Sequence, residues 1–228
     1  IFFRGDFPRK DAFETGTLVY PSHHVESYIQ NAGRYLNGSP GSGDKRKIIA
    51  DCFNGTASRV FPGLLNEYGC ETAVLRGQIK EFTNEEETKS DTRDAIENIT
   101  KMSRMNHEIG VIVGPHSNHI IVVDETGQIL TDGDIVALLC RYYLKRRPRT
   151  LISLPVTSSI ALERMIRSEG GTVEHTSTTL RAPEGVIDIY LDDVRRYPWL
   201  ELRHDPMVVF LRVLEYLTGQ LGLDEAQR

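Results

Sequence analysis

Hydrophobic residues recur along this chain in two patterns, short apolar runs and helical spacing with one apolar face. Apolar runs predict strands at residues 47–52, 72–75, 109–113, 120–124, 150–154 and 172–175, and a hairpin in which 120–124 pairs with 128–130. Helical spacing predicts helices at 22–36, 57–68, 91–102, 134–146 and 158–169, and a last helix from 206 onward. Strands that alternate with helices predict an α/β protein.

The ends of these helices carry typical start and stop residues. Four residues with a short polar side chain precede helical patterns and are predicted N-caps: Ser22, Asp91, Asp134 and Asp205. Gly69 and Gly170 are predicted to end two of the helices. The polar segment 83–91 is predicted to be an exposed loop, and Ile160 is expected to face inward from the helix at 158–169.

Seven turn-forming residues in a row, 37–43, predict a flexible linker. We therefore divide the chain into an N-terminal extension with one helix and the Gly/Ser linker (1–43), a first α/β domain (44–147) and a second, shorter one (148–228). The glycine-rich segment is not a phosphate-binding loop, because Asp44 follows its last glycine and the segment precedes a strand. Residues 180–204 show no interpretable pattern.

Composition narrows the possible functions. Lys and Arg number 27 against 32 Asp and Glu, so the net charge is −5, and a mildly acidic chain has no general reason to bind nucleic acid or an anionic membrane. The three cysteines are odd in number and far apart in the sequence, which indicates reduced side chains in the interior of a cytoplasmic protein. They are Cys52, Cys70 and Cys140.

The turn Gly114–His119 is the most informative candidate site, because it joins two predicted strands and carries two histidines and an asparagine. Such a set suits either a transition-metal site or a tight polar turn. The second candidate, Asp132-Gly-Asp134, is a possible Mg²⁺ motif, but its position just before an apolar helix favours a capping role for Asp134.

Several segments, in order and spacing, resemble the α-D-phosphohexomutases, the family of phosphomannomutase and phosphoglucomutase. Residues 47–75, with Asp51-Cys-Phe-Asn-Gly55, Phe61-Pro-Gly-Leu-Leu65 and Tyr68-Gly69, are similar to the start of that family's second domain. Residues 109–134 resemble the segment that carries its metal loop. Residues 150–176, with Thr157-Ser-Ser159 and Gly170-Gly171, and the helix after Asp205-Pro-Met207 resemble its third domain.

The resemblance implies two tandem phosphohexomutase-like mixed α/β domains preceded by a helical remnant of a first domain. It also implies a phosphoserine loop in the first domain, a D-G-D-x-D-R loop that holds Mg²⁺ in the second, a G-E-x-S-G sugar loop in the third, and a phosphate-binding fourth domain. This chain departs from that pattern at the metal loop. Where the family has its three aspartates and its arginine, the chain has Gly114, His116, Asn118 and His119.

The charge that this loop offers to a metal thereby falls from −3 to 0, so we expect no bound Mg²⁺ and no other cofactor. No phosphoserine motif or G-E-x-S-G motif occurs in the chain, so we assign no catalytic residue. Phosphoryl transfer depends on positioning and on charge neutralisation. We therefore expect a catalytically inactive module of sugar-phosphate metabolism, and a chain that is not an enzyme by itself.

The expected role is sugar-phosphate binding, regulation or assembly, with Ser117, Asn118 and His119 as candidate ligand contacts. Expected partners are a sugar phosphate and the remaining domains of a longer parent, which resembles a mannose-1-phosphate guanylyltransferase fusion; a homo-oligomer stays open. Two alternatives also stay open: a fragment of an active mutase, and a scaffold domain without a ligand. The histidine pair His116 and His119 further leaves open a Zn²⁺ or Ni²⁺ site.

Overall fold

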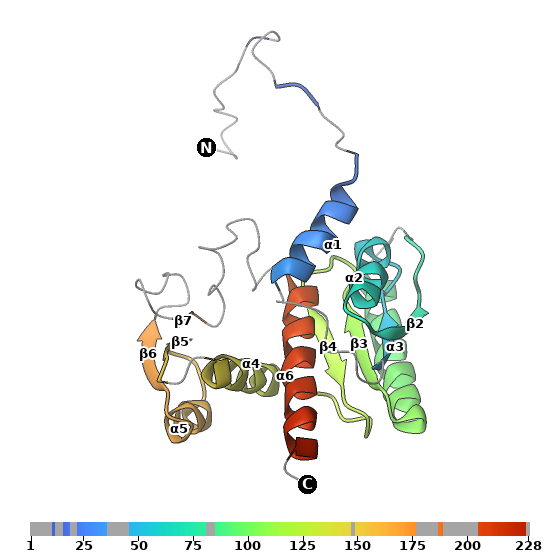
Figure 1. The fold of residues 1–228 in the computed structure, drawn as a ribbon. Coiled ribbons are helices and arrows are strands. Elements are labelled where there is room, and N and C mark those ends of the chain that lie inside the picture. The colour runs from blue at the N-terminus through green and yellow to red at the C-terminus, as the bar shows by residue number, and fades with distance from the viewer. Residues whose placement is uncertain are drawn as a thin grey trace.

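A computed structural model describes residues 11, 16–18, 22–35, 46–80, 85–146, 149–176, 187–188 and 205–226. These residues form a mixed α/β fold, as predicted, with two sheets (Figure 1). The first sheet has the order β2 (Glu71–Leu75), β1 (Lys47–Asp51), β3 (Ile109–Val113) and β4 (Ile120–Val123). Strands β1, β2 and β3 are parallel, and β4 is antiparallel to β3.

The second sheet is parallel and has the order β6 (Thr172–Thr176), β5 (Leu151–Pro155) and β7 (Ile187–Asp188). The helical segments are α1 (His24–Tyr35), the 3-10 helix η3 (Thr56–Arg59), α2 (Phe61–Glu67), α3 (Glu85–Asn106), α4 (Asp132–Arg146), α5 (Ile160–Ser168) and α6 (Pro206–Ala226). Six of the predicted strands are present, with ends shifted by no more than one residue. The predicted hairpin arm at 128–130 is reduced to a single antiparallel bridge between Ile129 and Val123.

The central strands β1 and β3 are buried on both faces, which is why they read as continuous apolar runs, whereas the edge strand β2 is largely exposed. Ile49 and Ile112 point to one face and pack with Ile99 of α3. Ile48 and Val111 point to the other face, in a core that also contains α2, α4 and α6. The same core includes Ile152 and Leu154 of β5, so it is continuous between the two sheets.

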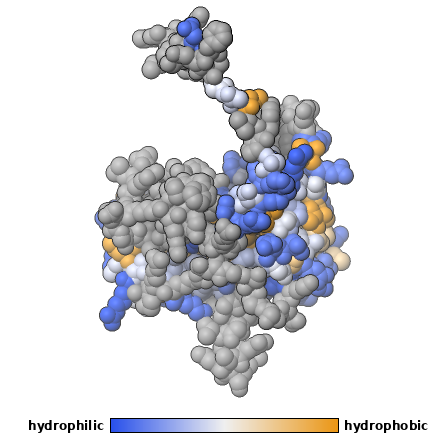
Figure 2. All heavy atoms as spheres, turned by 45° about the horizontal axis from the view of Figure 1, so that its top comes forward, coloured by the Kyte–Doolittle hydropathy of each residue, from blue (hydrophilic) through white to orange (hydrophobic). Residues whose placement is uncertain are grey.

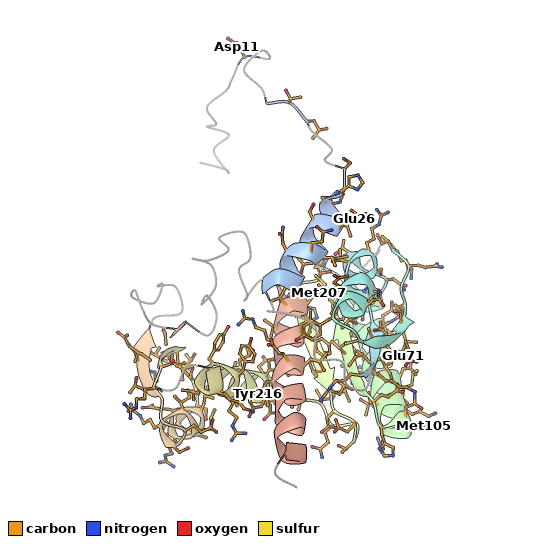
Figure 3. The ribbon with its side chains drawn as sticks, viewed as in Figure 1. Asp11, Glu26, Glu71, Met105, Met207 and Tyr216 are labelled. Carbon is orange, nitrogen blue, oxygen red and sulfur yellow. The ribbon has the colours of Figure 1, made fainter. Side chains whose placement is uncertain are left out.

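Helix α6 lies between α4 and β4 (Figure 1). The rings of Phe61 in α2 and Phe210 in α6 meet edge to face, with centroids 5.8 Å apart. On the α4 side, the Lys145 ammonium lies 5.8 Å from the centroid of the Tyr216 ring (Figure 3). The last helix thus joins the packing around both sheets, and the domain boundaries drawn from the sequence stay predictions.

Two predicted helix starts are wrong. Helix α3 begins at Glu85, so the segment predicted as a loop is largely helical and Asp91 is not an N-cap. Instead, the backbone carbonyl of Asp91 accepts a hydrogen bond from Arg76 at 3.0 Å. Helix α4 begins at Asp132. The Thr131 hydroxyl accepts the Asp134 N–H, and the Asp134 carboxylate accepts the Thr131 N–H, so the two residues form a capping box with Thr131 as the N-cap.

The other helix ends follow the sequence signals more closely. Asp205 caps α6, because its carboxylate accepts the Val208 N–H at 3.2 Å, as predicted. Gly69 and Gly170 have φ values of 79° and 86°, the left-handed conformation expected at helix C-termini. Ile160 is 68% exposed on the first turn of α5, so its predicted inward orientation is wrong.

Hydrophilic side chains cover most of the described surface that Figure 2 shows, and apolar residues lie in small separate patches. The three cysteines are free and buried, and burial raises the pKa of the Cys52 thiol to about 12, so this thiol is unreactive at neutral pH. No helix in the described part of the chain is long and apolar enough to cross a membrane.

Candidate functional site

The turn between β3 and β4 is closed by its own backbone. The Gly114 N–H donates to the His119 carbonyl at 3.0 Å, and the Ser117 N–H donates to the Gly114 carbonyl at 2.8 Å. Ser117 has a φ of 53°, a left-handed conformation that tight turns require. The four residues between Gly114 and His119 therefore form one compact loop at the carboxyl end of β3.

This loop packs on the turn that follows β1. The hydroxyls of Thr56 and Ser117 are hydrogen-bonded at 2.8 Å. A Cβ atom on Gly55 would lie 2.5 Å from the carbonyl oxygen of Pro115, so the two backbones touch where Gly55 has no side chain. Since β1 and β3 are parallel neighbours, both turns lie at the same edge of the sheet, where α/β folds place their ligand sites.

His119 and Gly114 fit each other sterically. A Cβ atom on Gly114 would overlap the imidazole ring of His119, so this ring occupies the space into which a side chain at position 114 would project. The ring is held by Asn118, because its Nδ1 lies 2.9 Å from the Asn118 Oδ1. If that Nδ1 carries the proton, the amide NH₂ of Asn118 keeps both of its donors for a ligand.

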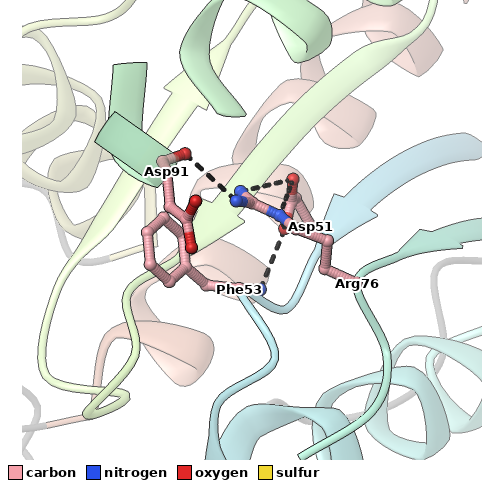
Figure 4. Close-up of polar contacts among 4 residues, drawn as sticks. All are labelled: Asp51, Phe53, Arg76 and Asp91. Carbon is pink, nitrogen blue, oxygen red and sulfur yellow. Dashed lines mark hydrogen bonds and ion pairs between the residues drawn. The ribbon is translucent and has the colours of Figure 1, made fainter. Parts of the chain in front are cut away.

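An ion pair between Asp51 and Arg76 lies at the carboxyl ends of β1 and β2, at the same edge of the sheet (Figure 4). The carboxylate of Asp51, which is 2% exposed, accepts Arg76 Nε at 2.9 and 3.0 Å and Nη2 at 2.8 Å. It also accepts the Phe53 N–H at 2.9 Å, while Arg76 donates to the Asp91 carbonyl. The guanidinium lies 4.3 Å from the centroid of the Phe53 ring. Arg76 thus joins β1, β2 and α3 at one point.

The loop does not fit Mg²⁺, which prefers carboxylate oxygens. Positions 114–119 contain no Asp or Glu, and the one amide oxygen, Asn118 Oδ1, is engaged by His119. Nor does the described part of the chain gather three or more His, Cys, Asp or Glu residues in a metal-binding group. The structure brings Ser117, Asn118 and His119 together in one turn without a carboxylate, and their role as ligand contacts stays a prediction.

Three residues of this edge were not assigned to the site from the sequence. Gly55 and Thr56 hold the loop, and Arg76 supports the strand end below it. The available signal was the pair Gly55-Thr56 directly after a buried strand, where a glycine permits a close backbone approach.

Comparison with known proteins gives a consistent result, although no family model matches the chain. The chain is 30% identical over 152 residues to a phosphoglucosamine mutase of Methylocella silvestris, which covers 66% of this chain and 33% of that protein. It is 24% identical over 172 residues to a probable phosphoglucosamine mutase of Methanopyrus kandleri. This match covers 75% of the present chain and 37% of that protein. The chain thus spans about a third of the length of the curated relatives it matches.

Solved structures show the same fold. A phosphoglucomutase/phosphomannomutase family protein of Burkholderia thailandensis superimposes with a TM-score of 0.62 at 20% identity, over 86% of this chain and 44% of that one. The phosphoglucomutase parafusin of Paramecium superimposes with a TM-score of 0.57 at 15% identity, over 87% of this chain and 38% of that one. The fold is therefore shared over most of the chain.

Proposed function

Because the chain is related to the α-D-phosphohexomutases, we propose that it is a phosphohexomutase-like module that binds a sugar phosphate without Mg²⁺ and does not itself transfer a phosphoryl group. The observation that carries the proposal is the loop Gly114–His119, which has no acidic residue and lies between two intact strands. The names of the relatives support a sugar phosphate as the class of ligand.

The chemistry of the loop suits an anion better than a cation. Its side chains include the amide of Asn118, the hydroxyl of Ser117 and two imidazoles, and none of them is acidic. A phosphate group with a charge of about −1.5 to −2 at pH 7 needs hydrogen-bond donors and no neighbouring carboxylate. The Thr56–Ser117 and Gly114–His119 bonds hold the loop in place without a metal ion.

The same loop argues against catalysis by this chain. Phosphoryl transfer relies on positioning and on neutralising the charge that moves with the phosphoryl group, to which metal ions contribute. A loop without carboxylates lacks the ligands that would bind this metal ion. We therefore place the module in regulation or assembly of a larger sugar-phosphate enzyme.

Titration calorimetry with glucose 1-phosphate and mannose 1-phosphate tests the proposal, with Mg²⁺ and with EDTA. We expect the same affinity in both buffers and no conversion to the 6-phosphate. Asn118→Ala should weaken binding about 10-fold or more, because a hydrogen bond to a charged group contributes ~1.5–3 kcal/mol. The control Glu97→Gln, on exposed α3, should bind like the wild type.

Two results would contradict the proposal in different ways. Mg²⁺-dependent binding, or formation of the 6-phosphate, would favour a fragment of a working mutase. No binding of either sugar phosphate would favour a scaffold domain without a ligand.

A gain-of-function series tests whether restoring the three carboxylates gives the loop affinity for Mg²⁺. The quadruple variant G114D/H116D/N118D/H119R should acquire measurable Mg²⁺ affinity, because it restores three carboxylates. The triple variant that keeps His119 should not, since a side chain at position 114 would overlap its ring. Equal Mg²⁺ affinity in both variants would refute this account of the loop.

A further inference from the structure

A cavity lies between the first two turns of α4 and α5, next to the loop that follows β5. Its volume is about 450 Å³, within the ~300–1,000 Å³ of small-molecule sites. It lies at the carboxyl end of β5, whose two neighbours in the parallel sheet are β6 on one side and β7 on the other. Open α/β sheets bind ligands at such a point, where the connections diverge to the two sides.

The lining of the cavity combines hydroxyl groups with an apolar floor. Thr131, Thr157 and Ser158 contribute hydroxyls. Val136, Leu162 and Met165 contribute partly exposed apolar side chains. A monosaccharide ring offers the matching surfaces, because its hydroxyls lie around the edge and its C–H groups form an apolar face.

The charge of the lining indicates which monosaccharide fits. Among the described residues that line the cavity, Asp132 and Asp134 are charged and none is Lys or Arg. The N-termini of α4 and α5 contribute partial charges of about +0.5 each, which together offset about half of the negative charge of the two carboxylates. A net charge near −1 remains, and it disfavours a phosphate group at this place.

The two carboxylates differ in whether they are already hydrogen-bonded within the chain. Asp134 accepts the N–H and the hydroxyl of Thr131 at 2.8 and 2.7 Å, and these hydrogen bonds hold the pKa of Asp134 below its ordinary value. By contrast, the carboxylate of Asp132 makes no hydrogen bond or ion pair with the part of the chain that the structure describes. Asp132 is therefore the carboxylate available to a ligand.

We propose that this cavity is a second ligand site, separate from the Gly114–His119 loop, and that it takes an unphosphorylated monosaccharide, with Asp132 favouring one that carries an ammonium group. The site goes beyond the proposed binding of a sugar phosphate and does not depend on it. An ammonium-bearing sugar gains the interaction with Asp132, a neutral sugar keeps only the hydroxyl and apolar contacts, and a phosphorylated sugar is repelled.

The experiment is a calorimetric titration of the full chain with glucosamine, glucose and N-acetylglucosamine, in mildly acidic buffer in which the amine is protonated. We expect glucosamine to bind roughly two- to five-fold more tightly than glucose, as an exposed ion pair allows. Asp132→Asn should remove this preference and leave glucose binding unchanged, whereas Glu97→Gln should keep it. Ala161→Phe, on an exposed wall of the cavity, should abolish binding of all three sugars.

Each failure has a definite meaning. Lack of saturable binding by any of the three sugars would overturn the site, and so would an Asp132→Asn variant that keeps the preference for glucosamine. Asn118→Ala separates the two proposals, because it should weaken glucose 1-phosphate binding and leave glucosamine binding unchanged. If Asn118→Ala weakened glucosamine binding as well, the cavity would not be a separate site.

Discussion

Gly55→Ala is a sharp test of how the site loop is held, because two effects of opposite sign compete at this position. The backbone at Gly55 has φ −92° and ψ −174°, an extended conformation that any residue adopts. Without a steric conflict, alanine would stabilise the fold by about 0.4–1 kcal/mol by restricting the unfolded chain. The added Cβ would, however, lie 2.5 Å from the Pro115 carbonyl oxygen and 2.9 Å from its Cα.

The steric overlap with Pro115 is expected to outweigh the gain from restricting the unfolded chain, because the overlapping atoms are backbone and cannot move aside like the end of a flexible side chain. Overpacking of this kind costs about 1–3 kcal/mol. Subtracting the gain of about 0.4–1 kcal/mol leaves a net loss of about 1 kcal/mol, with extremes near 0 and 2.6. The same shift should move Ser117 away from Thr56 and weaken sugar-phosphate binding.

Urea unfolding followed by far-UV circular dichroism measures this loss. Gly133→Ala is the matched control, because its Cβ would have no neighbour closer than Thr131 Oγ1 at 3.6 Å. Alanine at this helical position should stabilise the protein by up to about 1 kcal/mol. If Gly55→Ala were stabilised like Gly133→Ala, the close packing of the loop on the β1 turn would be refuted.

Three further predictions follow from individual contacts. Arg76→Met should lower the free energy of unfolding by about 3–5 kcal/mol, because it leaves the Asp51 carboxylate buried without a cation. Asp51→Ala should cost less, about 1–3 kcal/mol, since Arg76 is a quarter exposed and keeps access to water; urea unfolding of both variants gives the order, and the reverse order would contradict this reasoning. Burial raises the pKa of Asp205 although hydrogen bonds from Tyr28 and Val208 lower it, so the protonated form is favoured in the folded state. Its contribution to stability is complete below the ordinary pKa of 3.8 and is lost as the pH rises through the folded pKa; Asp205→Asn should flatten this part of the pH–stability curve, and an unchanged slope would assign it to other groups. Thr131→Ala should cost about 0.5–2 kcal/mol through loss of the α4 cap, which thermal unfolding detects; no change in the melting temperature would show that the cap is dispensable.

The sequence predicted β1 and β3 well because burial on both faces leaves a clear signal. Strand β3 reads as Ile-Gly-Val-Ile-Val, and such a run keeps its meaning whatever packs on it. The start of α3 was missed for the opposite reason. Its first turns are polar, so they carry no apolar period, although Glu85 and the residues after it are good helix formers.

The contacts of the site lie beyond local sequence patterns. Thr56 and Ser117 are 61 positions apart, and Arg76 is 25 positions from Asp51. Only the parallel pairing of β1 with β3 and β2 brings them together, and pairing order is not encoded in the periodicity of any one strand. The two apolar runs predicted the turn between β3 and β4, but they could not show what holds the loop.

Hydrogen bonds and close packing fix the shape of this loop, which offers no carboxylate to a cation. In a loop of three carboxylates, a cation would have to offset the mutual repulsion of like charges held close together. Here three contacts fix the turn: the hydrogen bond from the Gly114 N–H to the His119 carbonyl, the hydroxyl pair of Thr56 and Ser117, and the packing of the His119 imidazole against Gly114. The glycine and the histidine are therefore a matched pair, and either one replaced alone removes a contact or creates an overlap. It follows that EDTA should not change the free energy of unfolding, whereas a metal-held loop would be destabilised by the chelator.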